Sequence, residues 1–181
     1  MKDKMKIILI AGGTGGHVFP AIALSEFLEK KKVSYYFLTD QRCKIIFDKY
    51  KIEYKLISSS QIKKNIFFLP IIFLKILFGL IQSFIFFLNS KPKSVISFGG
   101  YTCLPPLLAA KILKIPIYIH EQNAIMGQAN RLFSKYSKKV LLGFKLTTHS
   151  TKNSHFVGIP IRKNFLELRG KKSVNKSIKI L

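Results

Sequence analysis

The sequence predicts an α/β fold with a Rossmann-like, doubly wound parallel sheet. Short apolar runs alternate with helical stretches along the 181 residues, which is the pattern of consecutive βαβ units. The first run, Ile7–Ile10, is wholly apolar and therefore suits a strand buried on both faces. Glycine-rich loops directly follow two of the runs, as in strand–loop–helix units that present backbone N–H groups to a phosphate.

Apolar runs bounded by polar or turn residues locate the elements in order. We expect strands at Lys6–Ala11, Ser34–Thr39, Tyr54–Ile57, Ser94–Ser97, Pro116–His120 and Lys139–Leu142, and the end of a short strand at Gly158–Arg162. Apolar spacing predicts helices at Pro20–Lys32, Arg42–Tyr50, Pro106–Leu113 and Gln128–Lys135. Pro20 is expected to open its helix, because proline is tolerated in a first turn. The polar stretch Lys145–His155 is expected to be a loop.

The segment Ile66–Leu88 is 23 residues long and almost entirely apolar, which is enough to span a bilayer. Lys75, Gln82 and Asn89 recur every seven residues, so a helix starting near Leu69 carries one narrow polar stripe. A transmembrane helix would put the flanking strands on opposite sides of the bilayer. A buried core helix would have to accommodate the phenylalanines at both ends. We therefore favour an interfacial helix, with one side on the sheet and another in lipid.

Lysine and arginine number 31 against 8 acidic residues, a formal net charge of +23. This balance favours a polyanionic partner, either nucleic acid or an anionic membrane surface. Abundant Lys, Ile, Phe and Asn are also expected from a genome of biased base composition. No RNA-binding signature accompanies the lysines, whereas Lys63, Lys64, Lys91 and Lys93 flank the apolar segment. The sequence therefore favours a membrane surface over nucleic acid.

Patterns near the two ends of the chain suggest its location and domain organisation. Met1–Lys6 is too short and polar for a secretory signal, so we expect the first glycine loop to face the cytoplasm.

The two cysteines and the C-terminal stretch bear on domain organisation. Cys43 and Cys103 lie far apart and indicate neither a disulfide framework nor a zinc site. One domain is expected over residues 1–165, followed at 166–181 by a basic linker and an apolar strand, Ser177–Leu181. A strand without its sheet indicates the start of a second domain.

Three motifs follow predicted strands and are expected to meet at the carboxyl edge of the sheet, where open α/β folds bind ligands. They are Gly12-Gly-Thr-Gly-Gly-His17, Phe98-Gly-Gly-Tyr101 and His120-Glu-Gln-Asn123. Two glycine loops at one edge could hold a diphosphate between them. The imidazole of His17 would then lie beside the ligand.

A nicotinamide dinucleotide site is the weaker interpretation of these loops. The third glycine of a G-x-G-x-x-G fingerprint falls on Val18, and the Gly-Lys-Ser/Thr ending of a P-loop is absent. Asp40, at the end of the second predicted strand, could bind a ribose hydroxyl. The first loop could also be a plain turn, His120 a structural histidine, and Glu121 the partner of a lysine.

Four motifs together resemble the MurG family: Gly12-Gly-Thr-Gly-Gly-His-Val-Phe-Pro20, Gly99-Gly-Tyr101, His120-Glu-Gln-Asn123 and Gly158-Ile-Pro-Ile-Arg162. The resemblance covers about Lys6 to Arg162. It implies the N-terminal half of a GT-B glycosyltransferase with two Rossmann-like domains. Residues 1–165 would be the acceptor-side domain, and residues 166–181 the beginning of the donor-binding domain. The family's hydrophobic, basic-rimmed membrane-docking patch corresponds to Ile66–Leu88.

The resemblance also implies roles for individual residues. His17 matches the proposed general base, which would remove the proton of the 4-hydroxyl of N-acetylmuramic acid. Asn123 and Arg162 match positions attributed to binding UDP-GlcNAc. The substrate-binding positions carried over with the motifs are Thr14, Gly15, Gly16, Gly99, Gly100, Tyr101, Glu121, Asn123 and Arg162. No cofactor and no metal is expected, because loop amides would hold the diphosphate themselves.

The implied reaction is inverting transfer of N-acetylglucosamine from UDP-GlcNAc to lipid I, undecaprenyl-pyrophosphoryl-MurNAc-pentapeptide, in peptidoglycan synthesis. The expected partners are these substrates, an anionic membrane surface and a C-terminal domain, with no nucleic acid. The expected location is peripheral, on the cytoplasmic side of the cell membrane. The 181 residues alone are expected to be inactive.

Two other functions are open at this point. The chain could be a membrane-anchoring, non-catalytic subunit of a split N-acetylglucosamine transferase, because the membrane half of the eukaryotic enzyme for dolichol-linked sugar is similar to this domain. It could also be another GT-B enzyme with a lipid acceptor, such as a diacylglycerol glycosyltransferase. The His-Glu-Gln-Asn motif speaks against the latter.

Overall fold

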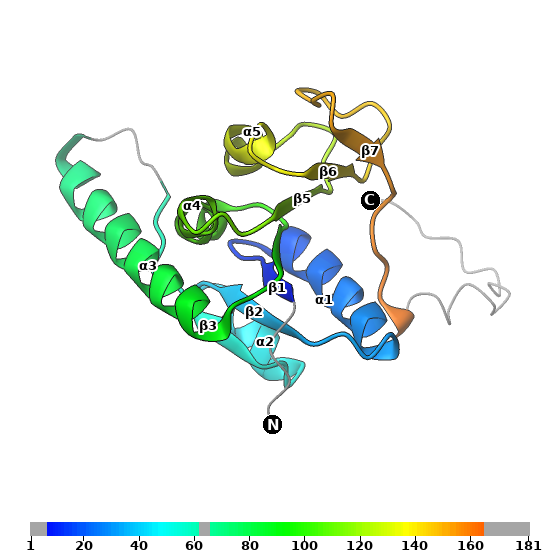
Figure 1. The fold of residues 1–181 in the computed structure, drawn as a ribbon, viewed down its shortest axis with the longest axis horizontal. Coiled ribbons are helices and arrows are strands. Elements are labelled where there is room, and N and C mark those ends of the chain that lie inside the picture. The colour runs from blue at the N-terminus through cyan, green and yellow to red at the C-terminus, as the bar shows by residue number, and fades with distance from the viewer. Residues whose placement is uncertain (1–6, 62–65, 165–181) are drawn as a thin grey trace, which may run out of the picture.

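The computed structural model describes residues 7–61 and 66–164, which form a seven-stranded sheet flanked by helices (Figure 1). The strands are β1 (Ile7–Ile10), β2 (Tyr35–Thr39), β3 (Tyr54–Leu56), β4 (Ser94–Ser97), β5 (Ile117–Glu121), β6 (Lys139–Leu142) and β7 (Ser154–Phe156). All neighbours are parallel, in the order β3-β2-β1-β4-β5-β6-β7. Because the order reverses between β1 and β4, the predicted doubly wound sheet is confirmed.

Helices cover both faces of the sheet. They are α1 (Gly15–Lys30), α2 (Lys44–Lys49), α3 (Leu69–Ser90), α4 (Leu104–Ile112) and α5 (Gln128–Ser134), with short 3-10 turns at Ile66–Phe68 and Tyr101–Cys103. Leu9 packs with residues of α1 and α2, whereas Ile8 and Ile10 pack with residues of α3, α4 and α5. Burial on both faces explains why the central strands appear as continuous apolar runs.

The start of α1 differs from the prediction. Pro20 was expected to open the helix, because an interior proline removes one hydrogen bond of the helical ladder. The helix instead begins at Gly15 and includes Pro20. Its first turn is therefore built from the last glycines of the loop, and His17 belongs to a helix rather than to a loop. The other helices agree within about two residues.

The last described strand was misplaced by the sequence pattern. A strand was expected to end at Gly158–Arg162, but β7 spans Ser154–Phe156, which overlaps the end of the stretch expected to be a loop. β7 is the terminal strand of the described sheet and is largely exposed, so burial imposes no apolar pattern on it. The chain then passes along α1, where the Lys163 N–H donates to Glu26 Oε2 at 2.8 Å. The linker and strand predicted at 166–181 lie outside the described residues.

The buried side of α3 is formed partly by small and polar residues. Gly79 and Ser83 are buried where α3 packs against α4 and the chain after β3. A Cβ on Gly79 would lie only 1.9 Å from the carbonyl oxygen of Ser58. The Ser58 N–H donates to Gln82 Oε1 at 2.8 Å, so the predicted polar stripe includes the residues that attach the helix to the domain.

The opposite side of α3 is apolar and exposed. Phe73, Leu74, Phe78, Ile85 and Leu88 are each at least half exposed. Figure 1 shows α3 along one flank of the domain, with a side turned away from the other elements. The buried-core interpretation is therefore wrong. By length and composition α3 could cross a membrane, but the strands that it joins, β3 and β4, lie in one sheet.

Replacing Gly79 by alanine should destabilise the protein, although this change normally stabilises a helix interior by about 1 kcal/mol. The new Cβ would collide with the Ser58 carbonyl oxygen, so α3 must shift outward. We expect urea denaturation to show a loss of about 1–3 kcal/mol in the free energy of unfolding. Ile81→Ala, on the exposed side of the same helix, should change it by less than about 0.5 kcal/mol. Equal stability of Gly79→Ala and wild type would contradict the close packing.

Candidate active site

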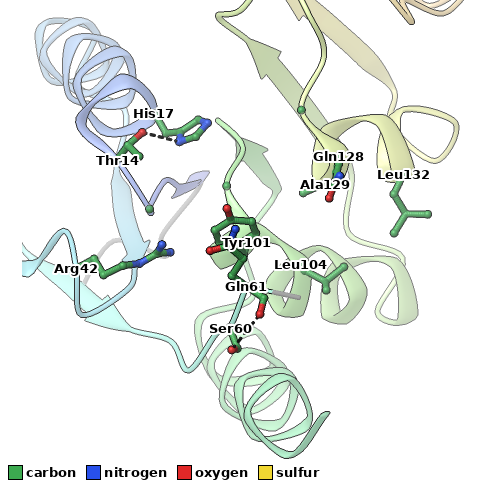
Figure 2. Close-up of a pocket in the computed structure, with 13 residues that line it drawn as sticks. Thr14, His17, Arg42, Ser60, Gln61, Tyr101, Leu104, Gln128, Ala129 and Leu132 are labelled. Atoms are coloured by element: carbon green, nitrogen blue, oxygen red, sulfur yellow. Dashed lines mark hydrogen bonds between the residues drawn. The ribbon is translucent and has the colours of Figure 1, made fainter. Parts of the chain in front are cut away.

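A cavity of about 490 Å3 opens at the carboxyl edge of the sheet, between the loops that follow β1 and β4 (Figure 2). The strand order reverses at this point, which is where open α/β sheets bind ligands. The turn after β2, the chain after β3, and residues of α4 and α5 complete the lining. Segments far apart in the sequence therefore meet in one hollow.

The structure brings only some of the predicted site residues into this cavity. Thr14, His17, Gly100 and Tyr101 line it. Gly15 and Gly16 lie next to them in the first turn of α1, and Gly99 lies against the ring of His17. Glu121, Asn123 and Arg162 do not line it.

The two glycine loops approach each other too closely for a side chain at Gly12 or at Gly100. A Cβ on Gly12 would lie 2.3 Å from the hydroxyl oxygen of Thr102, and one on Gly100 would lie 2.6 Å from the carbonyl oxygen of Gly12. Gly100 also has a φ of 85°, a left-handed conformation that favours glycine. Gly12 therefore leaves room for the Thr102 side chain, and Gly100 lets the second glycine loop approach the backbone of the first.

The N-terminus of α1 presents uncapped backbone amides at the edge of the cavity. Thr14 is the N-cap residue in an extended conformation, but its side chain makes no hydrogen bond to the amides of the first turn. Its hydroxyl instead lies 3.1 Å from Nδ1 of His17. Free N–H groups and the positive end of the helix dipole make this position attractive for an anion.

The imidazole of His17 fits against the second glycine loop. A Cβ on Gly99 would lie 3.2 Å from the Cδ2 atom of the ring, so glycine leaves the space that the imidazole occupies. Burial lowers the pKa of His17, and this outweighs the nearby charge of Glu121, which acts in the opposite direction. A neutral imidazole at pH 7 can accept a proton.

The carboxylate of Glu121 is a buried structural hub. Oε1 accepts hydrogen bonds from the backbone and side-chain N–H groups of Asn123, at 3.0 and 2.9 Å. Oε2 accepts from the Gly127 N–H and from Asn130 Nδ2, both at 2.9 Å. Glu121 is 1% exposed, so its carboxylate shapes the loop between β5 and α5 rather than facing the cavity.

Asn130 was not identified from the sequence. Its Oδ1 accepts from the Ser97 hydroxyl at 3.1 Å, while Nδ2 also reaches the His120 carbonyl oxygen at 3.3 Å. It therefore joins the ends of β4 and β5 to α5. A polar residue on a short helix carries no sequence signal for this role, because its partners lie on other elements.

Arg162 lies on another side of α1. Its guanidinium stacks 4.3 Å from the ring centroid of Phe19, and its Nη1 donates to the Tyr50 hydroxyl at 2.5 Å. Neither contact belongs to the cavity. Among the described residues, no group of three or more His, Cys, Asp or Glu side chains is placed to hold a metal ion.

Arg42, Leu104 and Leu132 also line the cavity and were not predicted. Arg42 pairs with Asp40, whose carboxylate also accepts hydrogen bonds from the Thr102 hydroxyl at 2.7 Å and the Cys43 N–H at 3.3 Å. Asp40 is 5% exposed, so these contacts occupy the group that could otherwise have met a ribose. The position of Asp40 at the carboxyl end of β2 was the only signal in the sequence that the turn containing Arg42 would reach the site.

Comparison with known proteins places this fold in a sequence family. Residues 7–142 match the profile of the "Glycosyltransferase family 28 N-terminal domain". The chain is 40% identical over 176 residues to a Rickettsia bellii protein named UDP-N-acetylglucosamine--N-acetylmuramyl-(pentapeptide) pyrophosphoryl-undecaprenol N-acetylglucosamine transferase, covering 94% of this chain and 48% of that protein. A Rickettsia prowazekii protein of the same name is 39% identical over 168 residues, or 90% and 43% of the two chains.

A solved structure shows the same architecture. The crystal structure of Acinetobacter baumannii MurG superposes with a TM-score of 0.74 and 27% sequence identity, over 93% of this chain and 49% of that one. The chain thus spans about half the length of the curated relatives and of the solved structure that it matches.

Glu121→Gln should loosen the loop between β5 and α5. The substitution replaces one acceptor oxygen by an NH2 group that faces N–H donors, and buried unsatisfied groups cost about 1–3 kcal/mol. We expect a loss of that size in the free energy of unfolding, together with faster amide exchange at Gly127. The control is Glu53→Gln at an exposed position, which should change neither quantity. Unchanged exchange at Gly127 in Glu121→Gln would show that the carboxylate does not hold the loop.

Proposed function

This chain belongs to the glycosyltransferase family 28 N-terminal domain family, and we propose that it is the acceptor-binding half of an enzyme that transfers N-acetylglucosamine. The proposed reaction moves this sugar from UDP-GlcNAc to the 4-hydroxyl of N-acetylmuramic acid in lipid I. The names of the Rickettsia relatives support this choice of substrates. The product would be the disaccharide-bearing lipid from which peptidoglycan is built.

One observation carries the proposal: the imidazole of His17 lines the cavity, and the uncapped N-terminus of α1 lies at its edge. His17 supplies the imidazole, and the first turn of α1 supplies the amides. Acceptor glycosylation needs both, since a sugar hydroxyl is a weak nucleophile and a lipid diphosphate is an anion. The cavity therefore offers both groups that the acceptor needs.

The proposed chemical step is a single displacement. A tautomer of His17 with its proton on Nδ1 donates to Thr14 and leaves the Nε2 lone pair available as a base. Nε2 takes the proton of the 4-hydroxyl while the oxygen attacks the anomeric carbon of the donor sugar. The bond from that carbon to the UDP oxygen breaks with its electron pair, so UDP leaves and the configuration inverts to a β-1,4 link.

The donor would be held mainly by a second domain. The chain spans about half of its relatives, and a GT-B enzyme closes its active site between two Rossmann-like domains. Asn123 and Arg162, outside the cavity, are proposed to meet UDP-GlcNAc from that side. We therefore expect sugar transfer from this chain only when it is joined to a donor-binding domain.

His17→Ala, in the chain joined to a donor-binding domain, should lower kcat for transfer to lipid I by roughly 10²–10⁴-fold, because the general base is lost. Transfer of radiolabelled N-acetylglucosamine into the lipid fraction measures the rate. His155→Ala, at an exposed position on β7, is the matched control and should keep the wild-type rate. An unchanged rate in His17→Ala would leave the first glycine loop as a binding element only.

The pH profile gives a separate test of the same base. Protonation removes the lone pair of His17, so kcat/KM should fall as the pH drops through the pKa of this residue. Because burial lowers that pKa from 6.5, the acid limb should lie below pH 6.5. An acid limb centred above pH 6.5 would point to a different titrating group.

We also propose that the apolar side of α3 rests on an anionic membrane, on its cytoplasmic side. Phe73, Phe78 and Ile85 are exposed, and each apolar side chain moved from water into lipid contributes about 1–2 kcal/mol at half exposure. Exposed Lys75 and Lys91 lie on or at the end of the same helix and would meet acidic head groups. Lys63 and Lys64 lie outside the described residues.

Phe78→Asp should reduce binding of the chain to liposomes that contain anionic phospholipid by roughly tenfold or more, because it puts a charge on the apolar side of α3. A flotation assay at low salt measures the bound fraction. Leu146→Asp is a matched control, since Leu146 is 90% exposed in the loop between β6 and β7. Wild-type flotation of Phe78→Asp would contradict membrane binding by α3.

A further inference from the structure

Arg42 brings a cation to the cavity from the turn after β2 (Figure 2). Its side chain is 49% exposed. The Nη2 atom lies 3.4 Å from the position that a Cβ on Gly13 would occupy, so the guanidinium lies directly beside the first glycine loop. It is therefore close to the uncapped N-terminus of α1, although it comes from a different part of the sequence.

A buried carboxylate fixes the orientation of this guanidinium. Nε of Arg42 donates to Asp40 Oδ2 at 3.0 Å, and Nη2 donates to the same oxygen. Burial alone would raise the pKa of Asp40, but the hydrogen bonds from Thr102 and Arg42 and the charge of Arg42 lower it. Asp40 thus stays ionised near neutral pH and holds one edge of the guanidinium.

Within the described part of the chain, the hydrogen bonds of Arg42 use only Nε and Nη2, so its Nη1 side is left for a ligand. The guanidinium carbon lies 5.3 Å from the ring centroid of Tyr101, which restrains the side chain from the direction of the second glycine loop. A cation held at one edge and against an aromatic ring loses little freedom when an anion binds to its remaining N–H groups. Arg42 is therefore preorganised for an anion in the cavity.

The opposite part of the cavity carries apolar side chains beside the polar Gln128. Leu104 of α4 and Leu132 of α5 line it, and Figure 2 shows them on the other side of Tyr101 from Arg42. A ligand that satisfies both parts has an anionic head and a hydrocarbon tail. A prenyl diphosphate has this construction.

We propose that Arg42 binds the second phosphate of the acceptor's diphosphate and thereby makes the cavity selective for diphosphate-linked over monophosphate-linked prenyl lipids. This inference rests on the proposed function, because it concerns the acceptor of that reaction. The amides at the start of α1 hold one phosphate, and Nη1 of Arg42 holds the other. Arginine suits this role because its planar fork can keep Asp40 and a phosphate at the same time.

The test compares farnesyl diphosphate with farnesyl monophosphate as ligands of the chain, by isothermal titration calorimetry. Wild type should bind the diphosphate at least about tenfold more tightly, the size expected for one additional charge-assisted contact. Arg42→Gln should weaken diphosphate binding by about tenfold or more while changing monophosphate binding by less than about threefold. An equal loss for both ligands, or no preference in wild type, would overturn the assignment.

Two variants separate this role from general effects. Lys44→Gln removes the same charge from an exposed residue of the neighbouring helix, which pairs with Asp48 at 2.6 Å, and should keep the diphosphate preference. Arg42→Lys keeps an ion pair with Asp40 but lacks the second set of donors, so a folded Arg42→Lys protein should also lose the preference. Loss of preference in Lys44→Gln, or its retention in Arg42→Lys, would contradict the proposal.

The outcome can be told apart from that of the proposed function. Arg42-dependent binding of farnesyl diphosphate without sugar transfer to lipid I by the two-domain protein would refute the transferase proposal and leave the role of Arg42 standing. Sugar transfer by the two-domain protein, together with an Arg42→Gln variant that keeps the diphosphate preference, would support the transferase proposal and refute the role of Arg42.

Discussion

The two glycine loops pack directly against each other at the carboxyl edge of the sheet, and the site depends on this contact. Thr102 fills the space that a Cβ on Gly12 would need, and Gly100 lies against the Gly12 carbonyl oxygen. The Thr102 hydroxyl also donates to Asp40, so the same contact helps to orient Arg42. A methyl group at either glycine would therefore disturb both loops. It would also displace His17 and Arg42, because their side chains are positioned by the same closely packed contacts.

Two buried carboxylates complete this arrangement from opposite sides. Asp40 connects the turn after β2 to the second glycine loop, and Glu121 connects β5 to the start of α5. Each accepts several hydrogen bonds, which offsets the cost of burying its charge. Neither carboxylate has to touch a ligand to affect the site. Both hold the residues that line the cavity in place before a ligand binds.

Much of this could be predicted from local patterns in the sequence, and the rest depends on contacts between distant segments. Ile7–Ile10 identified a buried strand because burial on both faces leaves a continuous apolar run. Four short motifs indicated the family, which the match of residues 7–142 confirmed. Asn130 was missed because its partners lie on other elements. Arg42 was missed because only the folded chain brings the turn after β2 next to Gly13 and Tyr101. Glu121 was expected at the substrate, but its position beside Asn123 does not reveal that its carboxylate turns inward.

The attachment of α3 has a consequence for how the protein would meet a lipid-anchored molecule. Gln82 holds the Ser58 N–H, and the chain that continues from Ser58 supplies Ser60 and Gln61 to the cavity wall. The outer helix and the cavity are therefore mechanically linked. If α3 rests on a membrane, the cavity stays at a nearly constant distance from the lipid surface. The domain then meets lipid-anchored acceptors by diffusing in two dimensions instead of three, which raises their effective concentration at the cavity.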